Sequence, residues 1–336
     1  MLAGASCLPL RLAALGTSPF REWGGSALSG IIAAMTPILY HYPASPFAEL
    51  VRAALGLKRL AWGSLIVSNI LPKPDQTRLT GGYGRTPVVQ LGADIYCDTG
   101  AILPALDALP GPSLYPAPLG PLHRLVASWA NGPQFFAHVG AAMGGMTPEM
   151  MGEGFIKDRQ ARFGMDLAAL GKAAPHLAGQ AMVAAHWLSL SLADGRAFIG
   201  GDAPGAGDLA LYSNIWFVNA VPTAAANAQA MLAMPGVADW VARMAALGHG
   251  DRQEVSGDDA LAAARAAPPA PITGKVDAPY QPGMLVGVTQ EGTKDAPSIG
   301  RLLRCCPDGI SIAREVEDGL TVHVHFPRLG QLVLPA

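Results

Sequence analysis

The 336-residue sequence predicts an α/β region, then an all-helical region, then a small all-β region. The first prediction rests on short β-forming runs that alternate with amphipathic stretches between residues 37 and 109. The second rests on the helix-rich pattern of residues 118–250, and the third on short strands separated by turn signals in residues 279–336. A chain of this length accommodates two or three domains of roughly 100–200 residues.

Composition excludes several classes of protein. The 23 Lys and Arg residues nearly balance 25 Asp and Glu residues, which argues against a nucleic-acid-binding protein. The hydrophobic content of 50% is too high for a disordered chain, and no apolar run approaches the ~20 residues of a membrane span. None of the four cysteines lies in a CxxC pair, so we expect no structural zinc, no disulfide framework and a cytoplasmic location.

Residues 1–35 have no sustained periodicity. Arg11 interrupts their apolar residues, so they do not follow the pattern of a secretory signal peptide. We expect a disordered or non-native N-terminal extension, with the functional start at Met35.

The first predicted strand covers residues 37–42 and leads directly into a helix. Ser45 followed by Pro46 is typical of an N-cap and a first helical position. The helix then covers residues 47–55, and Gly56 ends it.

Further strands are predicted at residues 60–67, 86–91 and 95–97, with a turn or short helix after Pro74. Asp98 and Thr99 then cap a helix that ends near Leu109. The predicted order is therefore β-α-β-(α)-β-β-α over about 75 residues.

This region resembles the thioredoxin-like half of the glutathione S-transferases. In that family the middle motif has a basic residue, an apolar residue, a cis proline and Val, and the last has an acidic residue before Ser or Thr. The motifs that carry the resemblance are Ser45-Pro46-Phe47, Gly84-Arg85-Thr86-Pro87-Val88-Val89 and Asp98-Thr99-Gly100-Ala101-Ile102. Their shared order and spacing make the resemblance specific. It implies a thioredoxin-like glutathione-binding domain at residues 36–112.

Residues 118–250 resemble the all-helical domain of the same family. Amphipathic stretches begin near His123 and Phe155, and a third covers residues 177–192. The family's central buried helix usually begins with a Ser or Thr cap and an Asp three residues later. Here Gly205 occupies the cap position and Asp208 follows, so we expect the helix to form with one capping bond fewer.

The resemblance ends near residue 250. Residues 251–278 are rich in Ala, Pro and Asp and are predicted to be a linker. Residues 279–336 resemble a small β-barrel-like module of the SH3 type, which the ordinary transferase fold lacks. Such a module could recruit a protein partner.

Ser45 is the predicted catalytic residue. A free thiol has a pKa of ~8.5, and a hydroxyl at a helix N-terminus can donate a hydrogen bond that stabilises the thiolate. Spacing alone favours the interpretation of Ser45 as a simple N-cap, whereas the resemblance implies the catalytic role. Tyr40 and Tyr42 are alternatives, on one face of the strand, because some classes of the family use a strand-end Tyr. A serine in place of cysteine disfavours a disulfide reductase.

The resemblance also implies five glutathione-binding residues. The peptide bond before Pro87 is expected to be cis, which exposes the backbone of Thr86 to the glutathione peptide. Arg85 would meet a carboxylate of glutathione. Asp98 would pair with the α-ammonium of the γ-glutamyl group, while Thr99 and its helix N-terminus would bind the α-carboxylate.

The predicted function is transfer of glutathione to a hydrophobic electrophilic small molecule by a homodimeric detoxification enzyme. The alternative is a non-catalytic glutathione-binding or protein-interaction scaffold with the same fold. No metal is expected, because His323 and His325 form a pair without a third ligand. Trp129, Phe135, Phe136 and Trp216 are candidates for the wall of the acceptor pocket.

Overall fold

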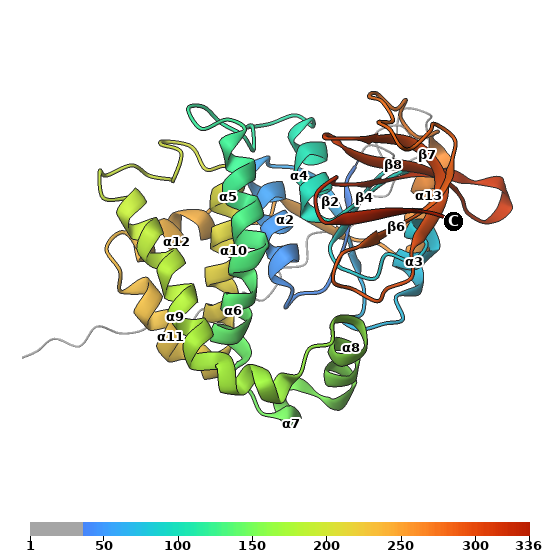
Figure 1. Ribbon diagram of the computed structural model, residues 1–336. Helices are drawn as coiled ribbons and strands as arrows, with labels where there is room; N and C mark the ends of the chain where they lie inside the picture. Colours follow the sequence, from blue (N-terminus) through green and yellow to red (C-terminus); the bar gives the residue numbers. More distant parts are fainter. Residues whose placement is uncertain (1–35) are drawn as a thin grey trace, which may run out of the picture.

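The computed structural model describes residues 36–336, so the predictions for residues 1–35 lie outside the described residues. Two lobes face each other across the molecule, one of helices and one built around a sheet (Figure 1). Among residues 36–336, no helix combines the length and the apolar character that crossing a bilayer requires.

The first region has the predicted order of elements. Strand β1 pairs in parallel with β2 and antiparallel with β3, and β3 pairs antiparallel with β4. This arrangement confirms the thioredoxin-like domain. Its elements are β1 (Ile38–His41), α2 (Pro46–Leu57), β2 (Ala61–Ile66), α3 (Pro74–Thr80), β3 (Val88–Leu91), β4 (Asp94–Cys97) and α4 (Thr99–Asp107).

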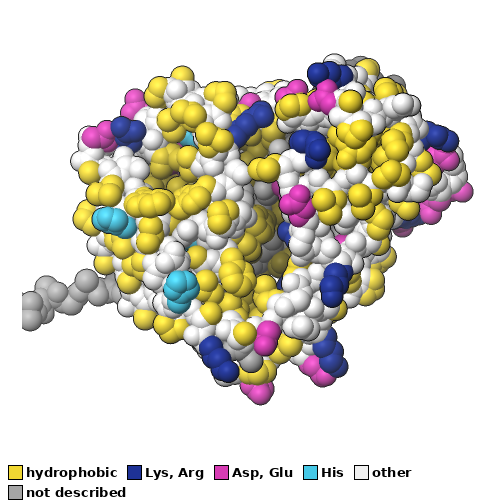
Figure 2. Space-filling model, viewed as in Figure 1, with side chains coloured by type: hydrophobic (Ala, Val, Ile, Leu, Met, Phe, Trp, Pro, Cys, Tyr) yellow, Lys and Arg dark blue, Asp and Glu magenta, His cyan; other side chains and the backbone are white. Residues whose placement is uncertain are grey.

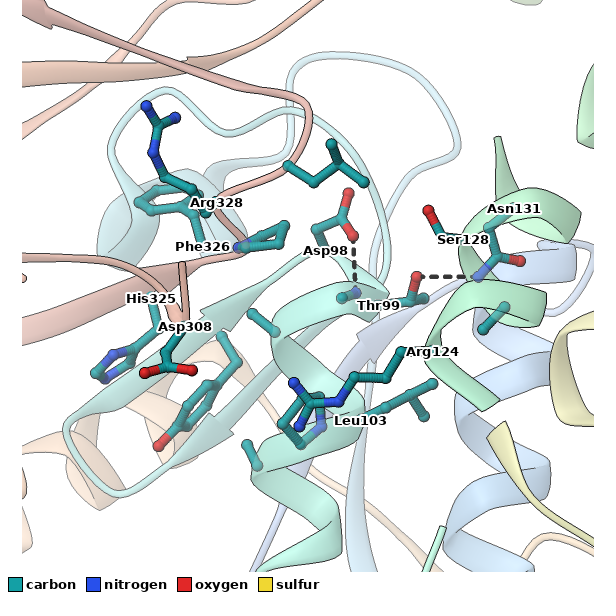
Figure 3. A pocket seen from close by; sticks show the side chains of 18 of the residues that line it. Asp98, Thr99, Leu103, Arg124, Ser128, Asn131, Asp308, His325, Phe326 and Arg328 are labelled. Carbon is teal, nitrogen blue, oxygen red and sulfur yellow. Dashed lines mark hydrogen bonds between the residues drawn. The ribbon is translucent and has the colours of Figure 1, made fainter. Parts of the chain in front are cut away.

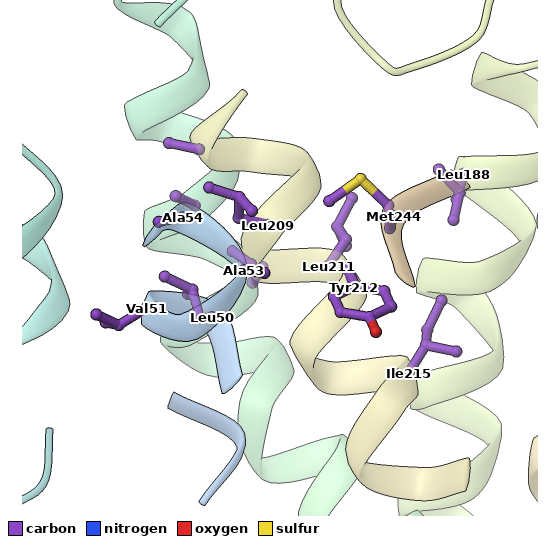
Figure 4. Close-up of a cluster of buried hydrophobic side chains, with 14 of the residues drawn as sticks. Leu50, Val51, Ala53, Ala54, Leu188, Leu209, Leu211, Tyr212, Ile215 and Met244 are labelled. Carbon is purple, nitrogen blue, oxygen red and sulfur yellow. The ribbon is translucent and has the colours of Figure 1, made fainter. Parts of the chain in front are cut away.

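Helix α2 joins the two lobes. Ser45 is its N-cap, because the Ser45 Oγ accepts a hydrogen bond from the Ala48 N–H at 3.1 Å, and Pro46 is the first helical residue. Buried residues of α2 such as Leu50 pack against the central helix α10 (Figure 4). Burial of this apolar surface fixes the start of α2 relative to the helical lobe.

The all-helical domain is also confirmed. Helix α10 is buried along most of its length and contacts α2, α5 and α6. The elements are α5 (Leu122–Asn131), α6 (Pro133–Met143), α7 (Pro148–Met151), α8 (Glu153–Phe163), α9 (Leu167–Ser191), α10 (Ala206–Ala220), η1 (Pro222–Ala224), α11 (Ala225–Leu232) and α12 (Val237–Ala245).

The start of α10 explains why glycine replaces the usual capping residue. Asp208 accepts hydrogen bonds from the N–H groups of Ile199 and Gly205, as expected for the closing residue of the turn. A Cβ on Gly205 would lie only 2.5 Å from the ring of His123, which is fully buried. The His123 Nδ1 instead accepts the Gly207 N–H at 3.3 Å. A side chain from α5 therefore accepts one of the first-turn N–H groups of α10, a role that a capping side chain usually has.

The prediction of a linker at residues 251–278 is wrong for residues 251–266, whereas residues 267–278 contain no helix or strand. Strand β5 (Asp251–Glu254) extends the sheet by pairing in parallel with β2, and helix α13 (Gly257–Ala266) follows it. Ser256 and Asp259 cap α13 reciprocally. Ala260 and Ala264 of this helix are buried in the hydrophobic core of the sheet lobe. Small alanine side chains that look like linker composition here allow close packing of a helix.

The C-terminal residues form the predicted small all-β module. Its strand order is β10-β6-β7-β8-β9, and β9 then pairs in parallel with β4. The module therefore continues the thioredoxin-like sheet into one ten-stranded sheet. A fifth strand, β10, was not predicted. The elements are β6 (Leu285–Gln290), β7 (Ser298–Cys306), β8 (Gly309–Glu315), η2 (Glu317–Gly319), β9 (Thr321–Phe326) and β10 (Gln331–Pro335).

Candidate functional site

A cleft between the two lobes contains two adjoining cavities, of about 690 and about 1000 Å³. Figure 2 shows the hollow from one side, with hydrophobic side chains on its walls. Phe47, Arg85 and Thr86 line both cavities, so the two form one continuous site. We call the first the polar cavity and the second the apolar cavity.

Ser45 lies on the wall of the apolar cavity, at the N-terminus of α2. Its Oγ accepts the Ala48 N–H, and its own hydroxyl proton has no acceptor within residues 36–336. The buried Arg52 donates to the Pro43 carbonyl oxygen at 3.0 Å and so holds the loop before Ser45 in place. The side chain is deeply set, since Ser45 is only 1% exposed.

The structure places the two alternative tyrosines, Tyr40 and Tyr42, in different environments. Tyr40 lies in the core and donates its hydroxyl to Gln90 Oε1 at 2.6 Å, and burial raises the pKa of Tyr40. Tyr42 lines the apolar cavity, with the Lys73 ammonium 5.9 Å from its ring centre. The expectation that both face the same side is wrong because β1 ends at His41 and the chain turns there.

The loop before β3 presents Thr86 to both cavities. The Thr86–Pro87 peptide bond is cis, as the resemblance implied. The fully buried Gln76 of α3 donates its Nε2 to the carbonyl oxygens of Tyr83 and Arg85 at 2.8 and 2.7 Å. The backbone N–H and C=O of Thr86 have no hydrogen-bond partner in the described chain, so they are available to a ligand.

Lys73 is a site residue that the sequence did not reveal. Its Nζ donates to the Thr86 Oγ1 at 2.6 Å, and the residue is 3% exposed. Burial, reinforced by the nearby Arg162 and Arg159, lowers the pKa of Lys73 to about 7. A single Lys in a Pro-rich loop carries no signal for this role, because its position depends on the fold of α3 and α8.

Asp98 and Thr99 lie together at the N-terminus of α4 (Figure 3). The Asp98 Oδ1 accepts the Gly100 N–H at 2.8 Å, and Thr99 Oγ1 accepts from Asn131 Nδ2 at 3.4 Å. Burial raises the pKa of the Asp98 carboxyl, although Arg85 opposes this effect. Both residues line the polar cavity, as does Pro87.

The apolar cavity has a wall of flexible and aromatic side chains. Of the candidates for this wall, Phe135 and Phe136 line the cavity. Trp129 instead stacks on Trp187, and Trp216 lies against Arg52. Methionine side chains can adapt to irregular apolar ligands. The cavity is lined by Met143, Met146, Met150, Met151, Met165, Phe155, Phe163 and Phe217, among others.

The structure thus brings the six predicted site residues to one cleft. Ser45 lies in the apolar cavity, Pro87, Asp98 and Thr99 in the polar cavity, and Arg85 and Thr86 at the junction. Within the described part of the chain, no group of three or more His, Cys, Asp or Glu side chains is arranged to hold a metal ion.

Known proteins show the same architecture. Residues 39–113 match the family model described as the N-terminal domain of glutathione S-transferase. A GST-like protein from Pseudomonas syringae, of known crystal structure, is 31% identical, with a TM-score of 0.73 over 90% of this chain and 100% of that chain. The chain belongs to the glutathione S-transferase family. Since 90% exceeds the share of the chain that precedes the C-terminal module, the likeness extends into the module.

Other solved transferases are more distant. A glutathione S-transferase from Rhodospirillum rubrum F11 is 22% identical, covering 62% of this chain and 87% of its own, with a TM-score of 0.45. Poplar glutathione transferase F1 is 15% identical, covering 62% and 92%, also with a TM-score of 0.45. No curated protein matches the sequence.

Proposed function

We propose that this protein binds glutathione across the two cavities and transfers it to an electrophilic small molecule. The observation that carries the proposal is the convergence of the α2 and α4 N-termini on the loop that ends in the cis peptide at Thr86–Pro87. This arrangement offers hydrogen-bond donors for two anionic groups and an open backbone edge between them.

The residues that line the cleft define the orientation of bound glutathione, with its γ-glutamyl end in the polar cavity. Its γ-glutamyl group binds at Asp98 and Thr99, where a carboxylate and a helix N-terminus suit an α-ammonium and an α-carboxylate. Its cysteinyl backbone pairs with Thr86. Its glycyl carboxylate meets Arg85 and Lys73, two basic residues that line the apolar cavity.

The thiol then lies beside Ser45. The Ser45 hydroxyl donates to the sulfur, which stabilises the thiolate and lowers the pKa of the thiol. The thiolate forms a new bond to an electrophilic carbon of a ligand in the apolar cavity. In a displacement the leaving group departs with the electron pair of its broken bond, and in an addition the product takes up a proton from water.

A homodimer and a cytoplasmic location complete the proposal. Helices α5 and α9 expose apolar side chains that include Leu125, 67% exposed, and Trp187, 53% exposed, and Trp129 of α5 stacks on Trp187 of α9. Apolar patches of this kind mark association surfaces, and a two-fold homodimer is the commonest soluble assembly. Cys97, Cys305 and Cys306 are free thiols, in keeping with a reducing compartment.

One observation favours the non-catalytic alternative. Ser45 is only 1% exposed, and its one hydrogen bond, accepted from the Ala48 N–H, is the bond of an ordinary helix N-cap. A protein in which Ser45 acts only as a helix cap would bind glutathione without activating it.

A pH–rate profile with an aryl halide electrophile distinguishes the two functions. The helix dipole contributes ~0.3–1 kcal/mol and a charge-assisted hydrogen bond ~1.5–3 kcal/mol, together roughly one to three pKa units. Ser45→Ala should therefore retain glutathione binding, lose rate and move the profile upward by at least one unit.

Ser256→Ala is a matched control, because Ser256 caps the exposed start of α13 away from the cleft. It should lose a similar cap, worth ~1 kcal/mol of stability, without a change in rate. An unchanged rate and profile in Ser45→Ala would leave the scaffold as the better account, or move the catalytic role to Tyr42.

A further inference from the structure

The C-terminal module forms one wall of the polar cavity, beside the start of α4. Phe326, Pro327 and Leu329, at the end of β9 and after it, line the cavity together with Gln290 of β6. A Cβ on Gly100 would lie 3.0 Å from the Pro327 Cβ, so a glycine in the first turn of α4 permits this close approach. The module is therefore packed directly against the helix that carries Asp98 and Thr99.

Gln290 makes the polar contact across this junction. Its Nε2 donates to the Asp98 Oδ2 at 3.3 Å, although the two residues are 192 positions apart. A carboxylate accepts hydrogen bonds and donates none, so it orients the amide with its NH2 group toward Asp98. The Gln290 Oε1 is then left buried, with no hydrogen-bond partner within residues 36–336.

The module is also fixed at its other side. Asp295, in the loop between β6 and β7, accepts two hydrogen bonds from the Arg162 guanidinium of α8, each at 2.6 Å. The Lys294 N–H donates to the Arg162 carbonyl oxygen at 2.9 Å. Both charged side chains of this ion pair are at most 7% exposed. Anchoring to α4 and to α8 holds Gln290 in a defined position relative to Asp98.

We propose that Gln290 is a glutathione-binding residue that the C-terminal module supplies to the γ-glutamyl end of the site. An α-ammonium has three N–H donors, and Asp98 and the Gln290 Oε1 would accept two of them. A buried acceptor without a donor is costly, and an incoming ammonium satisfies it. The inference rests on the proposed function and adds that recognition of the ammonium depends partly on the module.

Calorimetry with two ligands tests this role in the full-length chain. One ligand is glutathione, and the other is glutaryl-cysteinylglycine, which lacks only the α-ammonium. Gln290→Met keeps the length of the side chain and removes its polar atoms. The variant should bind glutathione about ten- to hundredfold more weakly, the range for a hydrogen bond to a charged group. Its affinity for the analogue should stay within about twofold of the wild-type value.

Gln281→Met, an exposed position on the same module, is the matched control and should bind both ligands as the wild type does. Equal weakening of both ligands in Gln290→Met would mean that Gln290 only supports the fold, and would overturn the inference. Unchanged glutathione binding would overturn it as well, while leaving the proposed function intact. A wild-type protein that binds no glutathione would overturn the proposed function itself, and the role of Gln290 with it.

Discussion

At the start of α10, the His123 side chain occupies the place of a capping side chain on residue 205. This arrangement predicts how substitutions at the two positions change the stability of the protein. At this point His123 occupies the space that a side chain on residue 205 would need, with ring atoms 2.5 Å from the Cβ position of Gly205. The ring also lies 3.0 Å from the Cβ position of Gly200, so it has little room to move away. Gly205→Ser should therefore overpack this site, at a cost of ~1–3 kcal/mol.

His123→Ala should destabilise the protein for a different reason. It removes the acceptor of the Gly207 N–H and leaves that buried donor unpaired, at a cost of ~1–3 kcal/mol. In the double variant the space is open, and the Ser hydroxyl can accept an N–H of the first turn, which recovers ~1 kcal/mol. The two substitutions should therefore couple favourably, by about 2 kcal/mol.

Urea unfolding followed by circular dichroism measures this coupling, provided that the slope with denaturant stays constant across the four proteins. Gly179→Ser in α9 is the control, since its Cβ would meet nothing within 4 Å, and it should change stability by less than ~0.5 kcal/mol. Additive effects of the two substitutions, within about 0.5 kcal/mol, would refute the idea that His123 substitutes for a capping side chain.

Two further predictions concern the ligand and the assembly. Burial raises the pKa of the Asp98 carboxyl, and only the ionised carboxylate pairs with an ammonium. Glutathione affinity should therefore fall as the pH drops through that raised pKa, by up to tenfold per pH unit. Calorimetry should detect this fall above pH 4, near the ordinary Asp value of ~3.9, and a flat affinity down to pH 4 would contradict the assignment. Trp187→Glu, on the apolar surface of α5 and α9, should reduce the particle seen by light scattering to the 34.7 kDa chain. Leu332→Glu, at an exposed position of β10, should leave a dimer, and a wild-type protein that is already monomeric would contradict the proposed assembly.

Local signals account for what the sequence predicted correctly. Ser45-Pro46 and Asp98-Thr99 cap helices through contacts with residues two or three positions away, which spacing alone reveals. The start of α13 carried a similar signal, because Ser256 is followed by Asp259 three positions later. The alanine and proline content of the following residues nevertheless favours a linker, because it matches the composition of unstructured segments.

Contacts between distant segments account for what the sequence could not predict. Lys73 belongs to the site because α3 and the loop at Thr86 fold against each other, and Gln76 orients that loop through two backbone carbonyls. Both are ordinary polar residues in a short segment. Nothing in their own spacing distinguishes them from residues exposed to solvent.

The pairing of β4 with β9 joins the most distant segments of the sequence among these contacts. It also determines which residues form the wall of the polar cavity. Asp94 pairs with His323 in parallel strands, and no hairpin or short turn brings such strands together. Their pairing places the β6 end and the chain after β9 beside α4, where Gln290 reaches Asp98. Removing the module would therefore expose the sheet edge at β4 and uncover the γ-glutamyl end of the proposed site. The same interface that completes the sheet thus also completes the wall of the cleft.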